Sequence, residues 1–203
     1  MNATMLNKTG AKSYLLGDIW LVELIIGGFI AAIIVIVVLV IFYYFNRIRI
    51  LYNRIEEAWA QIDVQLKKRF DLVPNLVETV KGYAKHEKEI FEKVAQARQG
   101  MVTGSREERI KSSNQLTSTL KSLFAVAENY PVLKASENFK LLQEQLEGIE
   151  NKIAYARQYY NSSVLSYNNL ITTIPGTWFA GNRSKHGFLE IPDEERRNVK
   201  VKF

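Results

Sequence analysis

The fold is decided by one apolar stretch near the N-terminus, residues 24–45, which runs LIIGGFIAAIIVIVVLVIFYYF and contains no charged residue. As an α-helix this stretch is about 33 Å long, because each residue adds about 1.5 Å, and the hydrocarbon core of a bilayer is about 30 Å thick. Inside lipid, a single segment satisfies its own backbone hydrogen bonds only as a helix. The sequence therefore predicts one transmembrane helix over residues 20–45.

A cleaved signal peptide is the alternative interpretation of this stretch. A signal peptide needs an apolar region of only about 7–15 residues, followed by a cleavage site of small residues. Here the run is longer and ends in aromatic residues followed by Asn46 and Arg47, which is typical of a stop-transfer flank. We therefore expect a permanent anchor.

The flanks of the stretch predict its orientation. Two lysines precede it, whereas Arg47, Arg49 and Arg54 follow it closely. Positively charged residues are retained on the cytoplasmic side, so residues 1–19 are expected outside the membrane and residues 46–203 in the cytoplasm. Aromatic side chains favour the membrane interface, and those expected there are Trp20, Tyr43 and Tyr44.

Small residues at a spacing of four occur within the predicted span. They are Gly27, Gly28, Ala31 and Ala32. Small side chains let two helices approach closely in lipid. We expect this face to form a contact between the transmembrane helices of two copies.

Past Asn46 the apolar residues recur mostly at alternating steps of three and four, the period of an amphipathic helix. The stripe consists of Ile48, Tyr52, Ile55, Trp59, Ile62, Leu66 and Val73. No helix-breaking residue separates this stripe from the span, so the two are expected to form one continuous rod. Pro74 is expected to end the rod or to kink it, because proline removes a backbone donor.

Two further helices are expected in the middle of the chain. A second apolar stripe, residues 76–97, fades at two glycines that punctuate a loop, residues 100–104. Ser105 and Glu108 form the pattern of a capping box, which predicts the start of a third helix. Pro131 is expected to stop that helix.

The last and longest helix is expected to begin after Ser136, a plausible N-cap, and to close at Pro175. Its apolar residues fall seven apart, as in a coiled-coil seam, at Phe139, Leu146, Ile153, Tyr160, Tyr167 and Ile174. Four amphipathic helices with short connections predict an all-α protein with a long antiparallel four-helix bundle over residues 46–174. An irregular tail over residues 175–203 follows.

The path of such a bundle predicts which parts lie near the lipid. The second and fourth helices return toward the membrane, so the loop at residues 100–104 and the exit at Pro175 are expected there. Trp178 and Phe179 follow that exit and lie either at headgroup depth or as a cap on the bundle core. The end of the tail is interpreted either as solvated or as a short hairpin or donated strand.

Polar residues at core spacing are interpreted as structural contacts rather than as catalytic groups. Asn75 or Asp71 is expected to cap the helix that follows Pro74, and Arg69 and Arg157 are expected to pair with Glu128 or Glu150. The residues expected to make polar contacts in the bundle are Asp63, Arg69, Asn75, Glu128, Glu150 and Arg157.

The composition argues against several kinds of chemistry. The chain has no Cys, so it has no disulfide, thiolate nucleophile or Cys-based zinc site. Its two histidines, His86 and His186, supply no Glu-x-x-His pair of the di-iron bundle type. The net charge of +6 is spread among Glu residues along the helices, which is typical of a solvated face rather than of a nucleic-acid site. We therefore expect no catalytic residue, no cofactor, no metal ion and no nucleic acid.

Two neighbouring motifs stand out, YNRIEEAWAQIDVQLK at residues 52–67 and RFDLVPNLV at residues 69–77, the second followed by KGY at 81–83. They resemble the opening and the central motif of the LemA family. The pattern continues with AENYP at 127–131, ENF at 137–139, ENKIAYAR at 150–157 and the tail from residue 174 to residue 203. Phe70 departs from the pattern, because the family commonly has His there, so no role of that His is carried over. The extension before Trp20 is also longer than the family pattern.

The resemblance implies a bacterial inner-membrane protein with a short outer N-terminus and a cytoplasmic helical domain. It implies no reaction, and one branch of the family is associated with magnetosome membranes. We expect a non-enzymatic single-pass membrane protein whose helical bundle self-associates as a membrane-bound scaffold or organiser. Its expected partners are the lipid bilayer, other copies of itself and other membrane proteins. The alternative is an accessory or signalling subunit that tunes a membrane protease or sensor.

Overall fold

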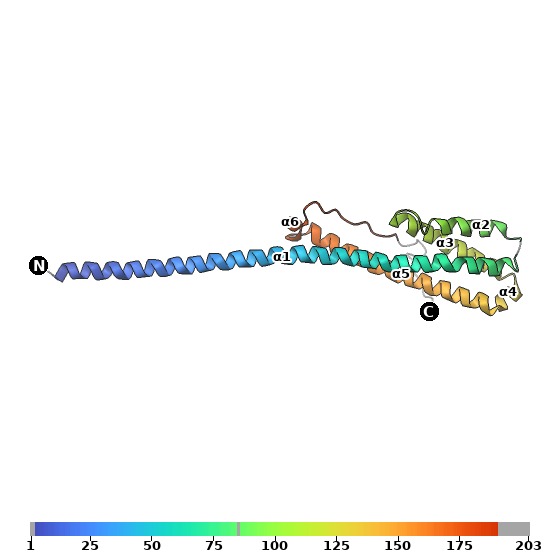
Figure 1. The fold of residues 1–203 in the computed structure, drawn as a ribbon, viewed down its shortest axis with the longest axis horizontal. Helices are drawn as coiled ribbons and strands as arrows, with labels where there is room; N and C mark the ends of the chain where they lie inside the picture. The colour runs from blue at the N-terminus through green and yellow to red at the C-terminus, as the bar shows by residue number, and fades with distance from the viewer. Residues whose placement is uncertain (1–2, 85, 191–203) are drawn as a thin grey trace, which may run out of the picture.

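The computed structural model describes residues 3–84 and 86–190, with side chains from residue 20 onward. Within these ranges the chain is helical and contains no strand, which confirms the all-α class. The helices are α1 (Ala3–Lys81), α2 (Lys88–Gln99), α3 (Arg106–Ala127), α4 (Pro131–Ala135), α5 (Glu137–Thr172) and α6 (Gly176–Ala180) (Figure 1).

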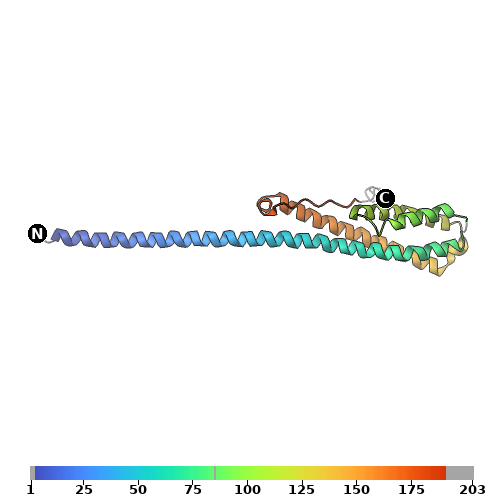
Figure 2. The same ribbon diagram turned by 45° about the horizontal axis from the view of Figure 1, so that its top comes forward.

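Helix α1 is a single helix of 79 residues that extends far beyond the other helices (Figures 1 and 2). Its apolar part is long and apolar enough to cross a membrane, with a mean hydropathy of 3.4 and nothing of that window buried by the rest of the chain. Burial begins at Ile48, and Ile55 and Ile62 are fully covered. The apolar segment and the amphipathic stripe therefore form one continuous helix, as the sequence predicts.

The expectation that Pro74 ends the rod is wrong, because α1 continues through it to Lys81. A proline inside a helix leaves the carbonyl four residues earlier without its usual donor. Here that carbonyl belongs to Phe70, and it accepts a hydrogen bond of 3.0 Å from Nε of Arg98 on α2. The Arg98 guanidinium also lies 3.7 Å from the centre of the Phe70 ring. A side chain from another helix thus replaces the missing backbone donor.

Helices α1 and α5 form the long pair of the domain, and they run in opposite directions (Figure 1). The shorter α2–α3 hairpin packs over the end of this pair that lies away from the apolar segment (Figure 2). Five of the six heptad residues on α5 are buried, at Phe139, Leu146, Ile153, Tyr160 and Tyr167. The sixth, Ile174, is 72% exposed because α5 ends before it, at Thr172.

The ends of the middle helices agree only in part with the sequence. Ser105 and Glu108 form the expected capping box at the start of α3. Ser136 is the N-cap of α5, although its side chain makes no capping hydrogen bond. Helix α3 ends at Ala127 before it reaches Pro131, which instead opens α4, where a missing N–H costs nothing.

The two segments expected near the lipid lie at different heights along α1. Helix α6 packs beside α1 where the apolar run ends, since Phe179 contacts Tyr44. The loop at residues 100–104 lies farther along, because Arg106, two residues after its end, pairs with Glu56. Glu56 is about 16 Å beyond Phe45 at about 1.5 Å per residue. The long pair reaches the end of the apolar run, and the hairpin stops short of it.

Candidate functional site

An aromatic cluster holds α6 against α1 at the end of the apolar run. The Phe179 ring stacks on Tyr44 with centroids 5.2 Å apart and meets Phe45 edge-on at 6.2 Å. Trp178, its neighbour in sequence, is 71% exposed. The structure therefore separates the two residues, with Phe179 packed on the helix and Trp178 turned outward. The other aromatics expected at the interface, Trp20 and Tyr43, are also exposed.

Residues 181–190, called the strap below, begin with a turn at Gly181 and Asn182 and run back along α5 without regular secondary structure, fastened by two asparagines. The Asn168 side chain accepts a hydrogen bond from the His186 N–H at 3.0 Å and donates one to the His186 carbonyl at 2.9 Å. Asn161, one heptad earlier, holds the Leu189 backbone in the same way, with both distances 2.9 Å. These two residues were not predicted as site residues. Their spacing of seven within the α5 seam is the signal that could have found them.

We expect Asn168→Ala to release the middle of the strap. Two hydrogen bonds are lost together, and each contributes about 1 kcal/mol, so the His186 amide should exchange its hydrogen about tenfold faster or more. Hydrogen exchange followed by mass spectrometry checks this. Asn169→Ala is the matched control, because Asn169 is an exposed neighbour on the same helix. If the His186 amide hydrogen exchanges at the same rate in the two variants, the Asn168 hydrogen bonds do not stabilise the strap.

A buried arginine joins three helices inside the domain. Nη1 of Arg69 on α1 lies 2.7 Å from the Glu150 carboxylate on α5. The same nitrogen donates to the Ser113 hydroxyl at 3.1 Å and to the Thr117 hydroxyl at 3.0 Å on α3. Burial lowers the pKa of the Arg69 guanidinium, Glu150 opposes this shift, and the nearby Arg157 adds to it. The structure thus brings together three of the residues expected to make polar contacts.

The remaining members of that set lie elsewhere. Asp63 on α1 is paired with Arg109 on α3. Asn75 lies inside α1 rather than at a helix start, so the expectation that it caps a new helix is wrong. Glu128 is the exposed C-cap residue of α3. The sequence did not predict the pair between Arg106 and Glu56, whose atoms lie 2.6 Å apart.

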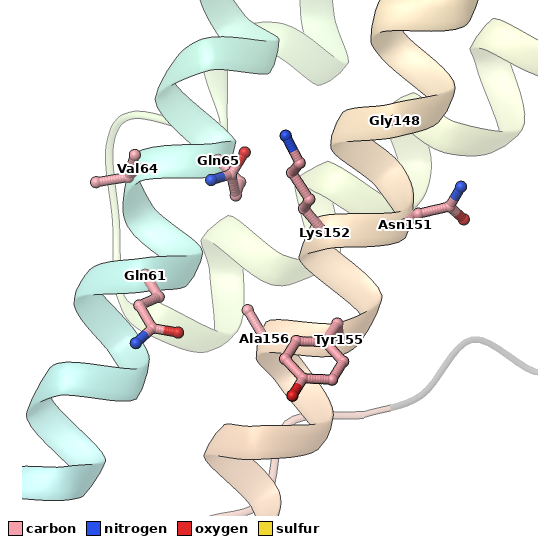
Figure 3. A pocket seen from close by; sticks show the side chains of 8 residues that line it. All are labelled: Gln61, Val64, Gln65, Gly148, Asn151, Lys152, Tyr155 and Ala156. Carbon is pink, nitrogen blue, oxygen red and sulfur yellow. The ribbon is translucent and has the colours of Figure 1, made fainter.

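An open groove runs between α1 and α5, on the side of the pair away from the α2–α3 hairpin (Figure 3). Its first part has a volume of about 530 Å³ and includes Val64 and Gln65 of α1 with Tyr155 and Ala156 of α5. A second part of about 570 Å³ continues it past Lys68 and Asp71. Nothing lies within 4 Å of where a Gly148 side chain would be, so the groove is open there. We call these two parts together the α1–α5 groove.

The groove has an apolar surface at one end and charges at the other. Val64 is 50% exposed and Tyr155 is 72% exposed. Lys68, Asp71 and Lys152 supply charges in the second part. The buried side-chain oxygen of Gln65 accepts no hydrogen bond from any residue that the structure describes. This surface suits a packed partner better than a small substrate.

The small residues of the apolar segment are also uncovered. A side chain at Gly27 or Gly28 would meet nothing within 4 Å, and Ala31 and Ala32 are exposed. Among the described residues there is no group of three or more metal-ligating side chains.

These features define a class: a helical domain carried at the end of one long, membrane-compatible helix. A sequence model of the LemA family matches residues 58–203, and the chain belongs to this family. It is also similar to the magnetosome protein MamQ of Magnetospirillum gryphiswaldense, with 23% identity over 163 residues. That match covers 67% of this chain and 60% of the relative, so the chain spans less than two thirds of the length of that protein.

Proposed function

We propose that this protein is a non-enzymatic scaffold of the bacterial inner membrane that works by self-association. Helix α1 crosses the bilayer once, residues 1–19 lie outside, and the helical domain stands in the cytoplasm as an antiparallel bundle. The observation that carries this proposal is the continuity of α1, which passes from the apolar segment into the domain core without a break. Because α1 is continuous, the domain is held at a fixed distance from the apolar segment and hence from the membrane.

The groove is the surface on which a second copy would pack. Copies that share one membrane lie parallel to each other, so their corresponding surfaces meet at the same height. Gly28 and Val64 are separated by about ten turns of 3.6 residues, which places them on the same side of a straight helix. One copy lying beside another would therefore meet the small residues of the span and the open groove together.

Charge complementarity also favours a second copy. Lys68 and Asp71, which also pairs with Lys67, lie on the α1 side of the groove, and Lys152 lines the same part of it on the α5 side. In a parallel pair related by a two-fold axis, α1 of one copy faces α5 of the other, so Asp71 and Lys152 approach each other twice. Such pairs set register and specificity more than affinity. The similarity to a magnetosome protein, which is named for a membrane organelle, is consistent with this kind of role.

The test measures the mass of the intact protein in lipid nanodiscs over a range of protein concentrations. We expect an oligomer, and we expect Tyr155→Lys to raise its dissociation constant at least about tenfold. The new cation would lie near Lys152 and its symmetry mate, and like charges facing each other cost several kcal/mol. Leu165→Lys is the control, because Leu165 is an exposed apolar residue of α5 outside the groove lining.

A monomer at every concentration would show that self-association is wrong. Equal weakening by the two lysine variants would show that the groove is not the contact. If the protein instead co-purifies at a fixed ratio with a different membrane protein, and Tyr155→Lys breaks that complex, the accessory-subunit alternative holds.

A further inference from the structure

A second concave site lies at the membrane end of the domain, between α1, α5 and the strap. Its volume is about 360 Å³. The residues that line it include Arg49 and Tyr52 of α1, Tyr167 of α5, and Arg183, Ser184 and His186 of the strap. Two guanidinium groups, three hydroxyl groups and one imidazole therefore surround one small space, and none of these six residues is an acid. We call it the collar pocket.

The walls of the collar pocket are held by specific contacts. Asn168 fixes the backbone of His186 through two hydrogen bonds. The His186 ring then packs 5.6 Å from the Tyr52 ring and 5.2 Å from the Tyr167 ring. Nη1 of Arg183 donates to the Ala180 carbonyl at 3.1 Å, at the C-terminal end of α6. The strap is thus held so that its arginine and serine stay opposite α1.

The charge around the pocket is of one sign. Neither the stretch from Leu24 to Ile55 nor the stretch from Asn151 to Leu189 contains an Asp or a Glu. These stretches nonetheless supply Arg47, Arg49, Arg54, Arg183 and Lys185 at this end of the domain. Elsewhere in the described chain several cations of the helices have carboxylate partners, such as Glu56 for Arg106 and Glu150 for Arg69. The collar pocket is therefore electrostatically suited to bind an anion that does not come from these segments.

The pocket lies at the depth where a bilayer carries its anions. Arg49 follows Phe45, the last residue of the apolar run, by four residues, or about 6 Å along the helix, and Tyr52 follows by about 10 Å. The polar headgroup layer occupies about 5–8 Å beyond the hydrocarbon on each side. Phosphate groups of the leaflet next to the domain are therefore within reach of both arginines.

We propose that the collar pocket binds the phosphate headgroup of an anionic phospholipid. The Arg49 and Arg183 guanidinium groups contact the phosphate, and the hydroxyl groups of Ser184 and Tyr52 donate to its remaining oxygens. Guanidinium groups suit this role because their paired N–H donors match phosphate oxygens. This inference deepens the proposed function, because it rests on α1 lying in a bilayer, and it assigns the lipid class that seats the domain.

The experiment uses the intact protein, stripped of lipid in detergent and titrated with phosphatidylglycerol or phosphatidylcholine under native mass spectrometry. We expect one phosphatidylglycerol per chain to bind at least about tenfold more tightly than phosphatidylcholine. Arg49→Gln and Arg183→Gln should each weaken it about fivefold, which corresponds to about 1 kcal/mol per juxtamembrane cation. Arg54→Gln removes the same charge from the same helix outside the pocket lining and should leave binding within about twofold of the unmodified protein.

Several results would overturn the proposal. The unmodified protein would refute it by binding the two lipids equally. An effect of Arg54→Gln as large as that of Arg49→Gln would also refute it, because it would indicate diffuse electrostatic attraction rather than binding in the pocket. Inorganic phosphate that binds in the absence of lipid, and that displaces phosphatidylglycerol at equal concentration, would identify a soluble anion instead. The same spectra report the oligomer. Loss of lipid binding with the oligomer intact refutes the collar pocket alone, and a monomer that retains lipid refutes self-association alone.

Discussion

Glu150→Ala is expected to lower the free energy of unfolding of the helical domain by about 3 kcal/mol, because it leaves a buried guanidinium without its carboxylate. Arg69 is only 2% exposed, and Glu150 is the carboxylate paired with its guanidinium. The hydroxyl groups of Ser113 and Thr117 remain as acceptors, but they carry no charge. The nearby Arg157 guanidinium, which already helps to lower the pKa of Arg69, makes the unpaired cation still less favourable.

The double variant Arg69→Met with Glu150→Ala separates a buried-charge penalty from a simple loss of packing. Removing both charges removes the desolvation cost, so the double variant should recover most of the stability lost in Glu150→Ala. We would compare the stability of the single and the double variant by thermal unfolding of the intact protein in detergent, using the midpoint of the helical circular dichroism signal. Glu147→Ala, an exposed carboxylate on the same helix, should change the midpoint little. A double variant as unstable as Glu150→Ala would contradict the charge argument.

The parts of this fold that follow from local patterns were predictable from the sequence. The apolar run requires a helix about as long as a bilayer is thick, and the stripe from Ile48 to Val73 continues its period without a breaker. The heptad seam correctly placed five residues of α5 in the core, and Ser105 with Glu108 correctly marked the start of α3. In each case the cause and the effect lie within a few helical turns of each other.

The parts that could not be predicted depend on side chains far apart in sequence. The strap is held by Asn161 and Asn168 through backbone atoms 28 and 18 residues away. The pair between Arg106 and Glu56 spans 50 residues. The groove exists because the α2–α3 hairpin covers one side of the α1–α5 pair and leaves the other open, and no local pattern states which side that is (Figure 3). Local sequence patterns predict the helices, whereas these long-range contacts determine how the helices are arranged.

At Pro74 the local pattern and the long-range contacts lead to opposite expectations for α1. Taken alone, Pro74 predicts a break, since a proline in a helix interior costs about 3 kcal/mol. A break here would detach the end of α1 from the rest of the rod. The Phe70 carbonyl that Pro74 deprives of a donor is instead served by Arg98, 28 residues later on α2. The continuity of the rod at Pro74 is therefore supported by a contact with the hairpin.

We expect Arg98→Met to destabilise the domain by about 2–3 kcal/mol when Pro74 is present, because it leaves the Phe70 carbonyl without a donor and removes the nearer of the two cations at the Phe70 ring, the other being Lys67. In a Pro74→Ala background, residue 74 regains a backbone N–H that bonds to Phe70, so the same change should cost only about 1 kcal/mol. The difference, a coupling of about 1–2 kcal/mol, is read from a double-mutant cycle of thermal or denaturant unfolding. Arg98→Lys keeps the charge but lacks the paired N–H donors of a guanidinium, so its stability should lie between those of the unmodified protein and of Arg98→Met. Additive effects of the two changes would mean that Arg98 stabilises the domain for reasons unrelated to the proline, and the continuity of α1 through Pro74 would then need another explanation.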